Sequence, residues 1–145
     1  MGKYRFVPYD PKYPKLFEAE KTRIKKVLGE EVVIEHFGST AVPGLGGKGL
    51  IDIYVVVGPK ERLAAITELA QSELGYEFKE SGGVAGERLF HQRKGPSGQI
   101  YHLHLTYTRS SDFEQSMLLR DYLRSNIAAA REYAEIKKLA SVKAL

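Results

Sequence analysis

A glycine-containing turn between two strand-like runs constrains this chain more than any other feature. Residues 31–37 are rich in β-branched and aromatic side chains, as in a strand, and Gly38 ends that run. Ser39 and Thr40 follow at a sharp turn with exposed backbone N–H groups, and the N-terminus of a helix beginning there favours an anion. We therefore expect Gly38, Ser39 and Thr40 to bind phosphate. The alternative is an ordinary helix cap, because Ser and Thr are common N-caps.

The second run, residues 50–57, places an acid inside an apolar strand. Alternate side chains of a strand point to opposite faces, so Asp52 and Tyr54 lie opposite a wholly apolar face. Asp is disfavoured in strands and is rarely buried without a partner. We expect Asp52 to hold a cation, accept strong hydrogen bonds or take part in catalysis; a structural acceptor at a strand end is the alternative.

A pair of histidines follows the same alternation in residues 99–107, where His102 and His104 share one face. If this strand lies beside the Asp52 strand, Asp52, His102 and His104 form a two-histidine, one-carboxylate site suited to zinc, manganese or iron. Two other interpretations stay open: the histidines lie on the solvated face of a sheet, or they bind phosphate or substrate through their N–H groups. His36 could reach the same cleft or, equally, pack at the end of its strand, and His91 could reach the cleft only if its face of the strand is the cleft face.

The run Glu-His-Phe-Gly-Ser-Thr-Ala-Val-Pro-Gly-Leu-Gly-Gly-Lys-Gly-Leu-Ile-Asp-Ile, residues 35–53, resembles the signature of the GrpB family. Residues 7–11, 102–105 and 119–124 fit the same family, so the resemblance spans nearly the whole chain. It implies a fold similar to that of nucleotidyltransferases of the DNA polymerase β superfamily. Some members of the family look fused to dephospho-coenzyme A kinase, which suggests nucleotide or cofactor metabolism.

Enzymes of that superfamily hold two divalent cations with an Asp-x-Asp pair on one strand and a third acid on a neighbouring strand. Asp52 fills the first place here, but Tyr54 fills the second. A phenol with a pKa near ~10 is a poor ligand for magnesium. This departure argues against two-metal transfer and leaves the histidines as candidates to replace the missing acid.

Two cationic side chains complete the expected site. Lys48 stands between the turn and the Asp52 strand, where it can pair with phosphate charge, and Arg120 is a second candidate for phosphate recognition. Solvent exposure is the plainer alternative for both, and a local ion pair with Asp121 accounts equally well for part of the Arg120 segment.

Composition limits the remaining possibilities. At 145 residues with 43% hydrophobic content, residues 1–145 are expected to form one α+β domain, a nucleotidyltransferase-like mixed sheet packed with helices. The chain has no cysteine, which excludes disulfides and thiolate chemistry, and no run long enough to span a membrane. We expect a cytoplasmic location. The net charge of +4 suits a phosphate-bearing ligand, but alternating charge signs do not indicate nucleic acid, and the oligomeric state stays open.

Periodicity predicts helices over residues 11–28, 59–74, 110–124 and 128–139, and an edge strand over 4–8. The Ser-Ser-Asp run at residues 110–112 is expected to form the N-cap of the third helix. Residues 76–80, 88–94 and 99–107 are expected to form a meander with turns at 81–83 and 95–98.

Together these features predict a nucleotidyltransferase-like protein that binds a nucleotide or phosphorylated metabolite, with divalent magnesium, manganese or zinc as cofactor and Asp52 and His104 as catalytic residues. Two alternatives stay open. One is a catalytically degenerate phosphate-binding module, favoured by Tyr54. The other is a metal-dependent hydrolase built on Asp52, His102 and His104.

Overall fold

The computed structural model describes the backbone of residues 6–144 and the side chains of residues 6–140. Its centre is a five-stranded sheet with the order β1-β2-β5-β4-β3. The strands are β1 (Val33–Phe37), β2 (Ile51–Val56), β3 (Glu77–Val84), β4 (Arg88–Lys94) and β5 (Ile100–Thr106). β2 and β5 are parallel, whereas the other pairs are antiparallel, so the sheet is mixed as predicted.

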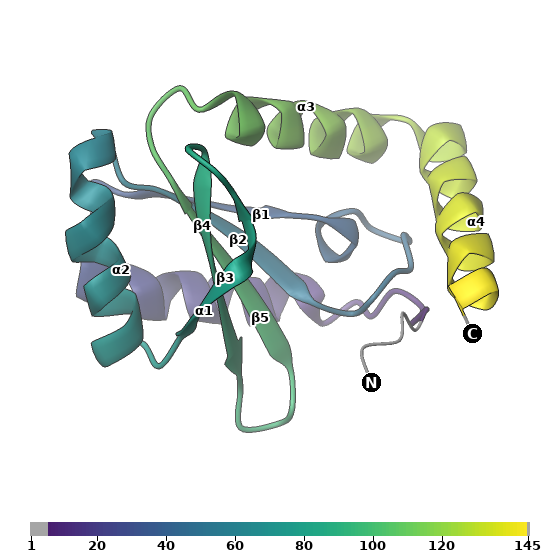
Figure 1. Cartoon of the computed structure of the whole chain (residues 1–145). Coiled ribbons are helices and arrows are strands. Elements are labelled where there is room, and N and C mark those ends of the chain that lie inside the picture. The colour runs from purple at the N-terminus through teal and green to yellow at the C-terminus, as the bar shows by residue number, and fades with distance from the viewer. Residues whose placement is uncertain (1–5, 145) are drawn as a thin grey trace.

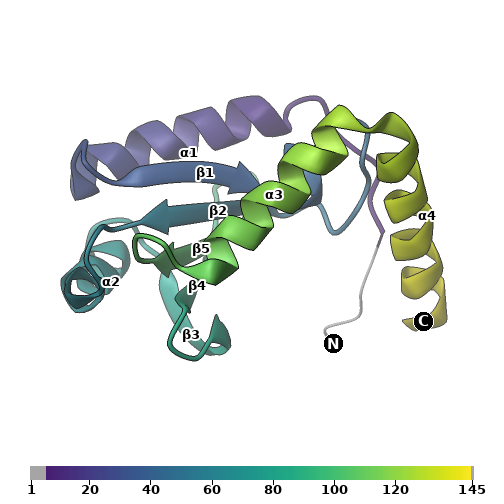
Figure 2. The ribbon, with the colours of Figure 1, turned by 90° about the horizontal axis from the view of Figure 1, so that it is seen from above.

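The helices cover both faces of this sheet. They are α1 (Tyr13–Leu28), α2 (Leu63–Ser72), α3 (Ser111–Ser125) and α4 (Ile127–Ala144), with short 3₁₀ turns η1 (Ser39–Ala41) and η2 (Lys60–Arg62). Figures 1 and 2 show α1 and α3 on opposite sides of the sheet, and α4 at one end beside the loop that joins η1 to β2. Ser110 caps α3 as expected, because its hydroxyl accepts a hydrogen bond from the N–H of Phe113.

The main core lies between the sheet and the helices α1 and α2. The apolar face of β2 is fully buried there, as the alternation of its side chains predicts. This face consists of Ile51, Ile53 and Val55, continued by Val57 just after the strand, and it packs with Leu103 and Leu105 of β5. The opposite face of the sheet therefore carries Asp52, Tyr54 and the two histidines of β5.

One predicted turn is wrong. Ser81, Gly82 and Gly83 do not end β3, which continues to Val84, and the chain turns at residues 85–87. A side chain at Gly82 would collide with the ring of Phe90, and one at Gly83 would lie 2.7 Å from the carbonyl oxygen of Arg88. These glycines let β3 and β4 approach each other at an irregularity in their pairing, which is a usual role for glycine inside a strand.

Of the predicted N-terminal strand, the described residues show a bridge between Val7 and Gly47, and Tyr4 and Arg5 lie outside the described residues.

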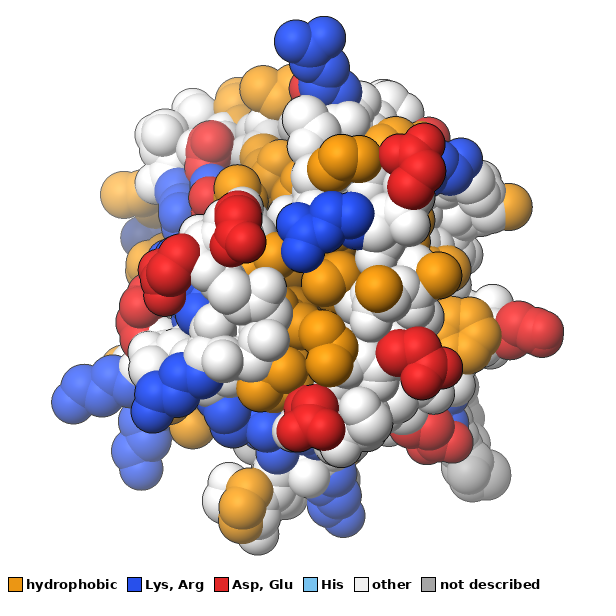
Figure 3. Space-filling model, turned by 90° about the vertical axis from the view of Figure 1, so that its left-hand side faces the viewer, with side chains coloured by type: hydrophobic (Ala, Val, Ile, Leu, Met, Phe, Trp, Pro, Cys, Tyr) orange, Lys and Arg blue, Asp and Glu red, His pale blue; other side chains and the backbone are white. Residues whose placement is uncertain are grey.

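The surface charges are mixed: Figure 3 shows acidic and basic side chains interspersed around a hydrophobic strip on the side of the molecule where α2 lies. No helix in the described part of the chain is long and apolar enough to cross a membrane.

His36 and His91 lie on the core face, not in the cleft. His36 stacks on Phe17 at 4.7 Å between ring centres, and its Nε2 lies 2.8 Å from the hydroxyl of Thr40. His91 is fully buried and contacts the hydroxyl of Thr67. Strand parity explains both positions, because His36 pairs with Ile53 and His91 pairs with Leu103, whose side chains point into the core.

These two histidines predict acid sensitivity of the fold. Burial lowers the pKa of each to about 4, against ~6.5 in an unfolded chain. Between those values the unfolded chain binds more protons, so the free energy of unfolding falls as pH falls from 6.5 toward 4, by about 1 kcal/mol per histidine at pH ~5.5. Denaturant titrations at pH 7.5 and 5.5 measure this loss. His36→Gln should reduce the pH dependence, and an unchanged dependence would contradict the assignment of His36 as a buried neutral group.

Candidate metal and phosphate site

Asp52, His102 and His104 converge on one side of the sheet. The Oδ1 atom of Asp52 lies 3.6 Å from Nδ1 of His102 and 3.6 Å from Nε2 of His104. One ligand atom from each residue lies within 4.8 Å of the other two. A tetrahedral cation with bonds of about 2.0–2.1 Å separates its ligands by roughly 3.4 Å, so the spacing suits a metal ion. The prediction that these side chains share a face is confirmed.

His104 is nearly enclosed. Its side chain is 7% exposed, and the rings of Phe37, Tyr54 and Phe90 surround it at 5.1 to 5.5 Å between centres. Among the described residues, both of its ring nitrogens are buried without a hydrogen-bond partner. A buried polar group left unpaired costs about 1–3 kcal/mol. A cation at Nε2, beside Asp52, would remove part of that cost.

The protonation states also suit a cation. Burial raises the pKa of the Asp52 carboxyl, but the two imidazoles outweigh burial and the net pKa is below its ordinary value. Burial lowers the pKa of His104, which the Asp52 carboxylate only partly offsets. At neutral pH the carboxylate is therefore ionised and the His104 ring is neutral, the forms in which these groups bind metals.

Gly38 lies directly against the Asp52 carboxylate. Its φ of +76° is unfavourable for other residues, and a Cβ there would lie 2.5 Å from Oδ2 of Asp52. A side chain at Gly47 would likewise collide with that of Ser39. Gly38 thus lets the turn approach the acid closely, and Gly47 lets the 44–49 loop approach Ser39. η1 has only three residues, and the Ala41 N–H already bonds the Gly38 carbonyl at 3.1 Å, so a helix dipole contributes little here.

A pocket of about 250 Å³ joins the predicted groups. The sheet and its loops supply Gly38, Ser39, Gly46, Gly47, Lys48, Leu50, Asp52 and His102. The turn, Lys48 and two of the candidate metal ligands, Asp52 and His102, thus border a single cavity, although they come from three segments of the chain. His104 is not part of this lining and reaches the site through its contact with Asp52.

Thr40 and Arg120 lie outside this pocket. The Thr40 hydroxyl is buried and donates to the Leu50 carbonyl at 2.8 Å. Arg120 donates to Glu35 at 2.7 Å, to the His36 carbonyl at 2.9 Å and to Asp121 at 3.0 Å. Arg120 therefore holds α3 against β1, and Thr40 ties the turn to Leu50, the residue before β2. Arg120 and Thr40 border a different pocket, of about 490 Å³, beside α1.

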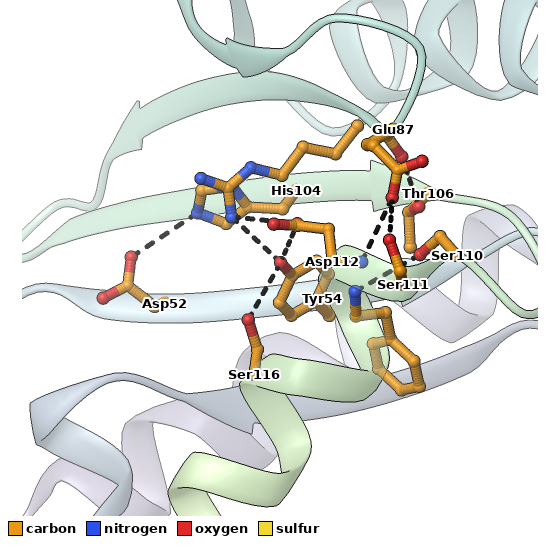
Figure 4. Close-up of polar contacts among 11 residues, drawn as sticks. Asp52, Tyr54, Glu87, His104, Thr106, Ser110, Ser111, Asp112 and Ser116 are labelled. Atoms are coloured by element: carbon orange, nitrogen blue, oxygen red, sulfur yellow. Dashed lines mark hydrogen bonds and ion pairs between the residues drawn. The ribbon is translucent and has the colours of Figure 1, made fainter.

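Tyr54 is sealed beneath the start of α3. Its hydroxyl donates to Asp112, lies 3.2 Å from the Ser116 hydroxyl and accepts from Nη1 of Arg88 at 2.9 Å (Figure 4). Burial raises the pKa of Tyr54 to about 12, so the phenol stays neutral. The position where a second metal-binding acid would stand is thus occupied by a hydrogen-bonded structural side chain.

Two pocket residues come from α4 and escaped sequence reasoning: Tyr133 and Lys137. The segment that carries them is alanine-rich and was predicted only as a final helix. The sole local signal was their spacing of four residues, which places them on one helix face.

The fold is nucleotidyltransferase-like. The Cid1 poly(U) polymerase superposes with a TM-score of 0.53 at 13% identity, covering 83% of this chain and 38% of Cid1, a likeness of fold alone. Residues 3–144 match the family of the GrpB protein. The chain belongs to the GrpB family, and the resemblance found in its sequence is confirmed.

Individual relatives agree with this assignment. GrpB from Enterococcus faecalis superposes with a TM-score of 0.82 at 30% identity, covering 96% of this chain and 84% of that one. The UPF0157 protein YqkA of Bacillus subtilis is 35% identical over 137 residues, which are 94% of this chain but 39% of YqkA. A dephospho-CoA kinase of Mycolicibacterium paratuberculosis is 25% identical over 97% of this chain and 40% of its own length. The chain thus spans well under two thirds of YqkA and of the kinase.

Two glycines offer a matched test of the site. Gly38→Ala and Gly44→Ala both place a side chain at positive φ, so each should lower the free energy of unfolding by about 1–3 kcal/mol. Only the Cβ at position 38 meets the Asp52 carboxylate, since nothing lies within 4 Å of the one at 44. Calorimetric titration with Zn²⁺ or Mn²⁺ should therefore show weaker binding in Gly38→Ala alone. Equal metal affinities in the two variants would contradict the arrangement.

Proposed function

We propose that the protein binds a nucleotide or another phosphorylated metabolite at one divalent cation held by Asp52, His102 and His104. The observation that carries this proposal is the buried ring of His104, whose nitrogens have no hydrogen-bond partner among the described residues and whose Nε2 lies 3.6 Å from the Asp52 carboxylate. Two imidazoles and a carboxylate suit zinc, manganese or iron better than magnesium, which prefers oxygen ligands. Such a cation, when bound, polarises a phosphoryl oxygen or activates a water molecule.

The ligand class follows from the residues beside this centre. Ser39 offers a hydroxyl and Lys48 an ammonium group to a phosphate in the same pocket. Cid1, which shares the fold, is known in complex with the UTP analogue UMPNPP, and the kinase relative acts on dephospho-CoA by its name. These likenesses support a nucleotide or nucleotide-derived ligand.

A metal-dependent hydrolase is the second candidate, and one observation favours it. Three protein ligands leave a further coordination position for water, as in catalytic zinc sites. Tyr54 meanwhile occupies the place of the second acid that two-cation nucleotidyl transfer requires, so chemistry at this site has to proceed with a single cation. In both candidates Asp52 and His104 orient the reacting group and Lys48 pairs with its charge.

The proposal predicts that Asp52→Asn loses ligand binding but keeps its stability. This change keeps the size of the side chain but removes its charge, so metal-dependent ligand binding should weaken at least tenfold while the melting temperature changes little. The measurement is a thermal-shift screen of nucleotides and coenzyme A precursors, each with magnesium, manganese or zinc. A ligand at ~100 times its dissociation constant adds about 2.7 kcal/mol of stability.

Glu73→Gln, which removes one negative charge from the exposed residue after α2, is the control and should respond like the wild type. If Asp52→Asn melts markedly lower while ligand binding stays unchanged, Asp52 is a structural acceptor and the metal centre is refuted.

Metal affinity should also depend on pH. Protons compete with a cation for both imidazoles, so affinity should fall as pH drops below about 6.5, the ordinary histidine pKa. Because burial lowers the pKa of His104, protons begin to compete with the cation for this ring at a more acidic pH than they would for an exposed histidine. Titration calorimetry at pH 7.5, 6.5 and 5.5 tests this, and the double variant His102→Ala with His104→Ala should lose the pH-dependent binding. Metal affinity unchanged in the double variant would exclude the site.

A further inference from the structure

Two side chains of α4 form the outer wall of the pocket that contains Asp52. Tyr133 and Lys137 border the same cavity as Ser39 and Lys48. The ammonium group of Lys137 lies 5.3 Å from the centre of the Tyr133 ring, which orients it. The pocket is therefore assembled from the sheet and from a helix that begins more than 70 residues after β2.

Tyr133 is also the large side chain among the residues that pack α4 on the rest of the protein. It packs with Ala129, Ala130 and Ala134 against a small buried cluster formed by Val42, Leu45 and Leu123. Val42 and Leu45 lie in the loop that leads from η1 into the pocket. Much of the remaining apolar surface of α4 is exposed, including Ile136 at 59% and Leu139 at 59%. Tyr133 thus links Lys137, one helical turn further on, to the packing of α4 on this cluster.

The charges around the pocket are unequal. Lys48 and Lys137 face a single acid, Asp52, among the described residues that line the cavity. A divalent cation at Asp52 would leave this lining with a large positive excess. A ligand with at least two negative charges balances that excess, and a phosphate monoester carries nearly two at neutral pH.

We propose that Lys137 is a second phosphate-binding cation of this site and that Tyr133 positions it. The ligand is then a phosphate monoester or a diphosphate, bound between α4 and the 44–49 loop. This inference rests on the proposed function, because it places the cation at Asp52 on the other side of the phosphate.

Three probes test the role of Lys137. AMP, inorganic pyrophosphate and uncharged adenosine are titrated calorimetrically into the Mn²⁺-loaded protein. Lys137→Met should weaken AMP and pyrophosphate binding by roughly ten- to a hundredfold, the usual worth of a hydrogen bond to a charged group, and leave adenosine binding and Mn²⁺ affinity unchanged. Lys138→Met, which removes the same charge from the next residue of α4, should bind all three probes like the wild type.

Tyr133 is tested as a positioning residue. Tyr133→Ala should weaken AMP binding as Lys137→Met does, with Mn²⁺ affinity retained, and Tyr133→Phe should restore it because the ring still packs on Leu45. If Lys137→Met binds AMP and pyrophosphate as tightly as the wild type does, the inference is overturned and the proposed function stands. If the wild-type protein binds Mn²⁺ but neither phosphate probe, the proposed function fails and the inference fails with it.

Discussion

The parallel pairing of β2 with β5 places Asp52 beside His102 and Tyr54 beside His104, and the rest of the site depends on this register. The register is itself held by the core, because Ile53 lies beside Leu103 and both side chains are fully buried. A slip of one residue would move the imidazoles into the core and expose apolar side chains. The packing that stabilises the sheet therefore also brings the carboxylate and the two histidines together.

The second constraint is the closure of α3 over Tyr54. Glu87 holds the start of α3 by accepting from the Ser111 hydroxyl and the Asp112 N–H at 3.1 Å each, and Asp112 in turn accepts from Tyr54 (Figure 4). This network leaves the Asp52 side of the cleft open and closes the Tyr54 side. Tyr54, held by this network, occupies the place where two-cation nucleotidyl transfer needs a second acid, which is why the proposed function uses a single cation.

The elements that local patterns describe were predictable from the sequence. Strand alternation placed Asp52, His102 and His104 on one face. Which face a side chain takes depends only on its place in the alternation along its own strand. The capping of α3 by Ser110 and most helix bounds followed from equally local signals. The adjacency of β2 and β5 needed the family resemblance, since strand order is not encoded locally.

What escaped prediction depends on packing between distant segments. Tyr133 and Lys137 reach the pocket only because α4 docks on the loop after η1, and an alanine-rich helix carries little sign of its partner. The glycines at 82 and 83 suggested a turn, yet they serve the approach of Phe90 and Arg88 from the next strand. For His36 the sequence left two positions open, the cleft and packing at a strand end, and the alternation of side chains along β1 turns its ring toward α1.

The most direct measurement of the central claim is anomalous diffraction from crystals soaked in Zn²⁺ or Mn²⁺. The account predicts one strong anomalous peak about 2.0–2.2 Å from the Asp52 carboxylate, a His102 ring nitrogen and Nε2 of His104. Crystals of Asp52→Asn should show a much weaker peak there. The account would be contradicted if strong anomalous peaks appeared only at other surfaces and no cation lay between these three side chains.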